Sequence, residues 1–149
     1  MAINAPRIGQ LTYISHQDPS IDWDAAKEHG ITLDSFRDNP TEETISKLQA
    51  KAGEKLTLFY LDLPHPNVMR EAMQESEGIA QAHFLAIKCL KSVENLFDEN
   101  GREVKLSHIR ATRTLDSGSI EKIPASIIWE IGFFLMVIGS GIERPLPRS

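Results

Sequence analysis

The side chains that most often bind metals or act as nucleophiles are scattered along this sequence. The five histidines stand far apart: His16, His29, His65, His83 and His108. None has a second histidine four residues away or a His-x-Glu neighbour, the spacings that point two ligands at one metal ion. The single cysteine, Cys89, excludes an intramolecular disulfide and has no histidine-based activation pattern around it. The sequence therefore predicts no metal site and no catalytic thiol.

The acidic residues are equally hard to assemble into an active site. Four of the aspartates in the N-terminal part of the chain are candidates, namely Asp22, Asp24, Asp34 and Asp38. They could supply a carboxylate pair for acid–base chemistry, but helix capping and solubility also explain them. Asp98-x-Asn100-Gly101 begins like a calcium loop, yet its glycine comes too early for one. Because Gly-x-Ser-x-Gly, Walker and dinucleotide-binding glycine motifs are absent from the sequence, we expect a protein that is not an enzyme and uses no cofactor.

The charge pattern argues against nucleic acid as a partner. The chain has 149 residues, a formal net charge of -5 and a pI near 5.5, so phosphate backbones are repelled on average. The one basic stretch, residues 102–113, is typical of a solvated loop or edge strand, with a phosphate site as the alternative. The N-terminal residues lack the features of a secretory or transit peptide, and a cytoplasmic location is expected.

An apolar run near the C-terminal end is the strongest candidate for an interaction site. It covers residues 127–142 and includes Glu130 as its one charged residue. At about 16 residues it is shorter than the roughly 20 that cross a bilayer, so we expect it in a core or in a homo-oligomer interface. If the core leaves part of it uncovered, four side chains would form a protein-binding surface: Trp129, Phe133, Phe134 and Met136.

The elements that would position this surface follow from hydrophobic periodicity and turn residues. The pattern predicts a strand at residues 11–15, helices at 20–29 and 40–52, and a central strand at 56–63 with apolar residues on both faces. It assigns no element to residues 31–39. Ser20 is expected to cap the first helix, and Asn39 with Pro40 should start the second.

The second half is predicted to be mainly helical. We expect a helix of about 30 residues over 67–97, with at most one break and with a kink or a close packing contact at Gly78, and then a short edge strand at 103–106. A last helix should begin near Pro124 and end at Gly139 and Gly141. These elements predict an α+β fold, in which a small, mostly antiparallel sheet is packed by two long helices and shorter N-terminal helices. One domain should span residues 1–149, with an arm at 1–10 and an extended tail at 143–149.

The order of these segments is more distinctive than any single motif. Tyr13–Asp18 begins in the first predicted strand and Leu58–Leu63 lies in the second, and a helix leads into Leu90–Ser107 with its acidic Asp-Glu-Asn-Gly turn. Ile120–Pro124 then precedes the run Ile-Ile-Trp-Glu-Ile-Gly and an apolar helix end. This order resembles small tailed-bacteriophage proteins of the tail-assembly-chaperone type, and the resemblance covers the chain loosely from residue 11 to residue 141.

The resemblance implies a non-catalytic virion-assembly protein, either a tail assembly chaperone or a structural adaptor. Such a protein works in the host cytoplasm or is retained in the virion, and its partners are phage structural proteins, namely tail-tube subunits or the tape-measure protein. The family supplies no catalytic residues. Two other functions stay open: a small phage-encoded inhibitor that binds a host protein, and a membrane-associated protein that uses its C-terminal apolar helix.

Overall fold

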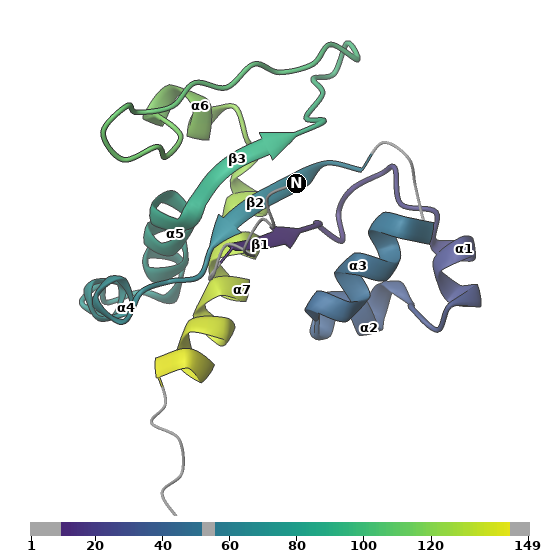
Figure 1. Ribbon diagram of the computed structural model, residues 1–149, viewed down its shortest axis with the longest axis horizontal. Helices are drawn as coiled ribbons and strands as arrows, with labels where there is room; N and C mark the ends of the chain where they lie inside the picture. Colours follow the sequence, from purple (N-terminus) through teal and green to yellow (C-terminus); the bar gives the residue numbers. More distant parts are fainter. Residues whose placement is uncertain (1–9, 52–55, 144–149) are drawn as a thin grey trace, which may run out of the picture.

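Three strands form one antiparallel sheet in the computed structural model, which describes residues 10–51 and 56–143 (Figure 1). The strands are β1 (Gln10–Tyr13), β2 (Leu58–Asp62) and β3 (Leu90–Glu94), and β2 lies in the middle. Thr12 pairs with Tyr60, and Phe59 pairs with Val93. A strand with apolar residues on both faces is expected to be central, and the structure confirms this prediction together with the α+β class.

Three short helices separate β1 from β2 in the sequence and lie to one side of the sheet (Figure 1). They are α1 (Trp23–Glu28), α2 (Leu33–Asp38) and α3 (Glu42–Lys51). The helix α2 occupies the segment that the sequence left unassigned, and its single buried side chain, Phe36, packs near Trp23 with ring centroids 6.1 Å apart. The buried side chains of the N-terminal helices therefore belong to the same hydrophobic core as those of the sheet.

The caps of these helices differ from those predicted. Asp22, not Ser20, caps α1, because its side chain accepts the backbone N–H of Ala25 at 3.1 Å. Thr41, not Asn39, precedes α3 and accepts the backbone N–H of Thr44 at 3.1 Å. The segments before α1 and α3 each contain several residues that could cap a helix. The residue that does so depends on which apolar side chains of the helix must be buried.

The predicted helix over 67–97 is wrong in its last third. The chain instead forms α4 (Pro66–Met73), a turn, α5 (Gly78–Cys89) and then strand β3, which follows α5 without a loop. One break in this helix was allowed for, whereas β3 was not expected. Central strand β2 needs hydrogen-bond partners along both edges, and residues 90–94 satisfy one of those edges.

Two further predictions about the C-terminal half are corrected. Residues 103–106 do not form a strand, because only an isolated bridge between Phe97 and Glu103 is present there. Asp116 caps a short helix, α6 (Ser117–Glu121), and the last helix, α7 (Ala125–Glu143), continues past the two glycines that were expected to end it. Gly139 lies within this helix and packs so closely against Met69 and Pro64 that a larger side chain would not fit.

Helices α5 and α7 cover one face of the sheet, the far face in Figure 1. Their buried side chains meet those of β2, and Leu61, Leu85, Ile131 and Leu135 are inaccessible to solvent. Gly132 permits the close approach of α7 to α5, since a Cβ there would overlap the backbone carbonyl of Ala82 on α5.

Within the described residues, no helix has the length and apolar character needed to span a membrane. The predicted arm and tail lie outside the described residues, except that Gln10 begins β1 and Glu143 ends α7.

Candidate protein-binding surface

The structure separates the four α7 side chains that the sequence grouped together. Trp129 and Phe133 are 39% and 43% exposed, Met136 is half-buried, and Phe134 is only 8% exposed. Phe134 packs in the core against Tyr13, with ring centroids 4.5 Å apart. Its place in the predicted surface is therefore corrected: a turn of about 100° per residue carries it from the outer face to the sheet.

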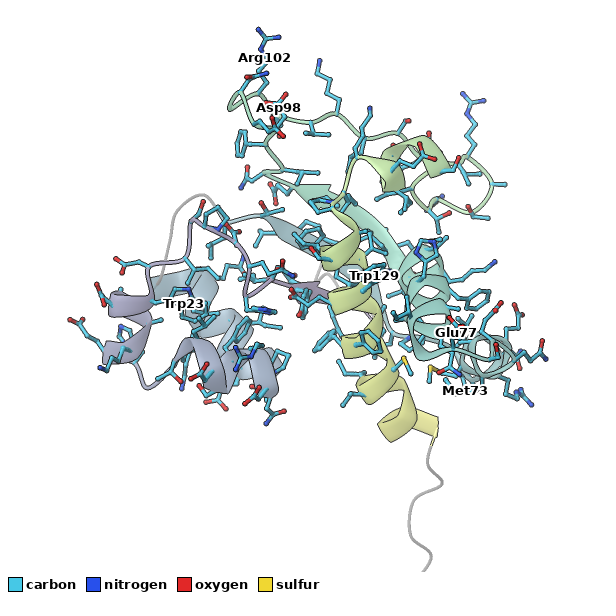
Figure 2. All side chains as sticks on the ribbon, turned by 180° about the vertical axis from the view of Figure 1, so that it is seen from behind. Trp23, Met73, Glu77, Asp98, Arg102 and Trp129 are labelled. Carbon is cyan, nitrogen blue, oxygen red and sulfur yellow. The ribbon has the colours of Figure 1, made fainter. Side chains whose placement is uncertain are left out.

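One exposed residue of the same helix was missed. Val137 is 74% exposed and stands one turn beyond Phe133, just as Phe133 stands one turn beyond Trp129. Residues spaced by four lie on the same side of a helix, so these three side chains form an apolar row, here called the α7 stripe. Figure 2 shows α7 from this side, with Trp129 on the face turned away from the sheet.

A cleft of about 510 Å³ runs beside the α7 stripe, between α7 and the end of α2. Its α2 side is polar and is formed by residues 37–40. Arg37 bonds Asp34 at 3.0 Å and lies 3.5 Å from Asp38. The cleft thus has one apolar wall on α7 and one charged wall on the N-terminal helices, an arrangement that suits a ligand with both kinds of surface.

The floor of the cleft is a hydrogen-bonded cluster centred on Glu130. Its carboxylate accepts bonds from the Tyr13 hydroxyl at 2.6 Å, the Ser15 hydroxyl at 2.7 Å and the Gln17 amide at 2.8 Å. The ring Nδ1 of His16 lies 3.2 Å from the same carboxylate, whose side chain is only 11% exposed. The cluster connects the segment after β1 to α7 through one acceptor, which is mostly but not fully buried.

The protonation and burial of this cluster suit positioning rather than catalysis. Burial, reinforced by the charge of Glu130, raises the pKa of Tyr13 far above its ordinary value, so the phenol stays neutral and donates its proton in a hydrogen bond. The Ser15 side chain is fully buried, and its oxygen also accepts the backbone N–H of Gln17 at 3.0 Å. Both hydroxyls are committed to structural bonds, and together they fix the orientation of α7 in the cleft.

The other side of the α7 stripe is the corner between α4 and α5. Met73 and Ile79 are both exposed there. The break at 74–77 changes the helix direction and turns them outward. Phe133 packs next to Gly78, and Figure 2 shows Met73 and Glu77 near the lower half of α7. The corner therefore extends the apolar surface beyond α7.

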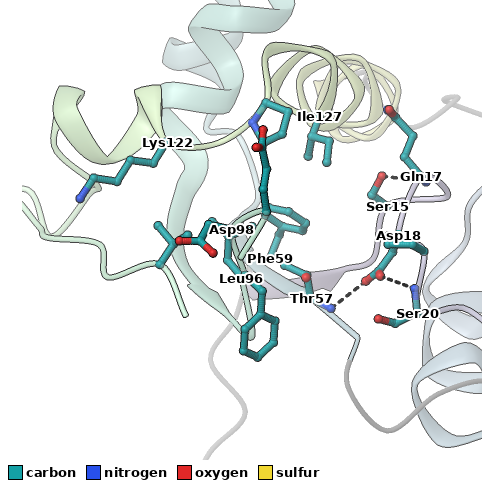
Figure 3. A pocket seen from close by; sticks show the side chains of 15 residues that line it. Ser15, Gln17, Asp18, Ser20, Thr57, Phe59, Leu96, Asp98, Lys122 and Ile127 are labelled. Carbon is teal, nitrogen blue, oxygen red and sulfur yellow. Dashed lines mark hydrogen bonds between the residues drawn. The ribbon is translucent and has the colours of Figure 1, made fainter. Parts of the chain in front are cut away.

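A second cavity, of about 540 Å³, lies between the loop after β1, the start of β2 and the start of α7 (Figure 3). Asp18 is its buried acid, but both carboxylate oxygens are occupied: one accepts the backbone N–H of Ser20 at 2.9 Å, the other that of Thr57 at 2.8 Å. Phe97 is exposed at the edge of this region. The cavity has no polar group left to orient a ligand among those that the structure describes as buried.

The remaining residues that could carry chemistry are not brought together. Among residues 10–51 and 56–143, no three histidine, cysteine or acidic side chains are grouped as metal ligands. Asp98 accepts the backbone N–H groups of Asn100 and Arg102, both at 2.9 Å, which confirms the predicted turn. In the basic stretch, His108 bonds the carbonyl of Lys91 at 2.7 Å and the arginines are exposed. This stretch is a solvated loop.

Cys89 should be unreactive toward thiol reagents in the folded protein. Burial raises the pKa of its thiol to about 12, and the carboxylate of Asp62 adds to the shift. Near pH 8 only about one thiol in ten thousand is then ionised, and the thiolate is the reactive form. We expect a chromogenic disulfide to label the native protein at least about a hundredfold more slowly than the guanidinium-denatured protein. Equal rates would show that α5 does not shield the thiol.

Comparison of the chain with protein-family models, with curated proteins and with solved structures finds no match. The geometry of the α7 stripe and the cleft beside it is therefore the basis for any assignment of function.

Proposed function

We propose that this chain is a non-catalytic protein-binding domain that acts as a tail assembly chaperone or structural adaptor in bacteriophage virion assembly. The observation that carries the protein-binding part is the α7 stripe, in which Trp129, Phe133 and Val137 stand exposed in one row. The choice of tail-tube or tape-measure proteins as partners rests on the resemblance described above.

The stripe is a specific surface rather than scattered exposed apolar residues. Single exposed apolar side chains are common on soluble proteins, whereas contiguous rows bordered by polar residues mark binding sites. Aromatic residues such as Trp129 and Phe133 contribute more than their share of the binding energy in protein interfaces. The Glu130 cluster holds α7 in place beneath them, so little conformational freedom is lost when a partner binds.

Phe133→Asp should abolish partner binding without unfolding the protein. A charge in the centre of an apolar interface must be desolvated without compensation, so affinity should fall at least about a hundredfold. The measurement is co-purification of the chain with co-expressed tape-measure and tail-tube proteins, with thermal unfolding as a check on the fold. Ile109→Asp is the matched control, because Ile109 is 46% exposed but lies on the loop between β3 and α6.

The same experiment separates the other functions. Retention of tail proteins by Phe133→Asp, or their loss in Ile109→Asp, would contradict the role of the α7 stripe. Recovery of a host enzyme in place of any tail protein from infected cells would favour an inhibitor. Partition of the wild-type chain into liposomes, lost in Phe133→Asp, would favour membrane association instead.

A further inference from the structure

We infer that the ligand of the α7 stripe is an amphipathic helix of another protein with lysine or arginine along the edges of its apolar face. This inference rests on the proposed protein-binding function and specifies the chemistry of the partner. The inference follows from the charged side chains that border the stripe on its two sides.

Both sides of the α7 stripe are acidic. On the α2 side, Asp34 and Asp38 outnumber Arg37, which lies within bonding distance of both and lines the cleft together with Asp38, so this border has an excess of one negative charge. On the α4–α5 side, residues 70–77 contain three glutamates and one arginine. Glu75 and Glu77 of this segment are exposed, and Glu77 directly precedes the glycine that packs next to Phe133. An apolar row between two acidic borders favours a ligand with an apolar centre and basic edges.

The shape of the surface favours a helix as that ligand. Trp129 and Val137 are eight residues apart, which places them about 12 Å from each other along the axis of α7. The cleft beside them follows the same direction, from Ser126 to Ile138. A helix laid in such a groove contacts it with side chains at positions i, i+4 and i+7 and carries its polar residues to the borders.

A second copy of the chain fits this surface poorly. The sequence of α7 contains no lysine or arginine, so two copies that met through their stripes would bring acidic borders together. The basic residues of the chain that cluster in sequence, 102–113, lie in an exposed loop rather than on a helix. An anionic lipid surface is also disfavoured, because carboxylates at the border would be repelled by it.

The test uses two synthetic helical peptides of about 14 residues, or roughly 21 Å in length. Both carry leucine along one face; one has lysine along the edges, and the other has glutamate. Fluorescence anisotropy at low salt should show that the full chain binds the lysine peptide at least about tenfold more tightly, and the difference should shrink as salt is added. Replacement of both Glu75 and Glu77 by lysine should reduce the preference about tenfold.

The control for this double reversal is Glu99→Lys with Glu103→Lys, an equal charge change on the loop after β3. It should leave the preference intact. Equal affinity for the two peptides, a preference unaffected by Glu75→Lys with Glu77→Lys, or no binding of either peptide would overturn the inference. Saturable binding to vesicles containing phosphatidylglycerol, lost in Phe133→Asp, would overturn it in favour of lipid. The proposed function fails separately, if tail proteins co-purify with the Phe133→Asp variant.

Discussion

Replacement of Gly132 by alanine should lower the free energy of unfolding by about 3 kcal/mol, the upper end of the usual cost of overpacking a core. The added methyl group would overlap the backbone carbonyl of Ala82, and a backbone atom cannot rotate away as a flexible side chain can. Helices α5 and α7 would have to separate, and the core beneath them would lose packing. Urea unfolding followed by circular dichroism measures the difference.

Gly78→Ala is the matched control for this substitution. Gly78 is also in a helix that packs near α7, but a Cβ there would lie 3.9 Å from the Phe133 ring, an ordinary contact. Since alanine favours the helical state more than glycine does, this variant should keep its stability or gain up to about 1 kcal/mol. A Gly132→Ala variant as stable as Gly78→Ala would refute the close approach of the two helices.

Glu130→Ala should lower the free energy of unfolding by about 3 kcal/mol. Each hydrogen bond to a charged acceptor is worth roughly 1.5–3 kcal/mol, and the contributions of several such bonds are not additive. The substitution removes the acceptor of Tyr13 and Ser15 together and leaves the buried hydroxyl of Ser15 without it. The loop after β1 would then lose its attachment to α7. Thermal and urea unfolding both report this loss.

Two variants determine whether the loss of stability in Glu130→Ala comes from the hydrogen-bonded cluster or only from the change in charge. Tyr13→Phe removes one donor and keeps the ring, so its cost should be smaller, about 1.5 kcal/mol. Glu121→Ala removes an exposed carboxylate of α6 and should change stability by less than about 0.5 kcal/mol. If Glu130→Ala were as mild as Glu121→Ala, the cluster would not anchor α7.

The elements that could be predicted from the sequence are those with one clear pattern. Strand β2 was predicted because residues 58–62 are apolar on both faces and a proline follows soon after. Strand β3 was missed because residues 90–94 continue the apolar period of the helix before them. These residues pair with β2, which is about 30 residues away in the sequence. The hydrophobic pattern within one segment cannot predict a contact between distant segments.

The candidate surface could be predicted only in part for a similar reason. The run over 127–142 is apolar on nearly all sides, so its sequence does not tell which side is covered. The contact of Gly132 with α5 settles the rotation of the helix: Phe134 then faces the sheet and Val137 faces solvent. The exposed side chains of Met73 and Ile79 depend on the break between α4 and α5, whose direction the sequence does not give either.

The position of α1, α2 and α3 between two paired strands has a consequence for how such a protein can evolve. Strands β1 and β2 would be a simple hairpin if residues 14–57 were a tight turn. The entropy lost on closing a loop rises only slowly with its length, so this excursion can lengthen, shorten or exchange its acidic residues while strand register is retained. One border of the cleft is thus built from exposed side chains of this excursion, whose buried residues, such as Phe36 and Leu48, belong to the core, and the other from α7. Substitutions at the exposed residues of the first border can therefore change the partner while the buried residues keep the fold.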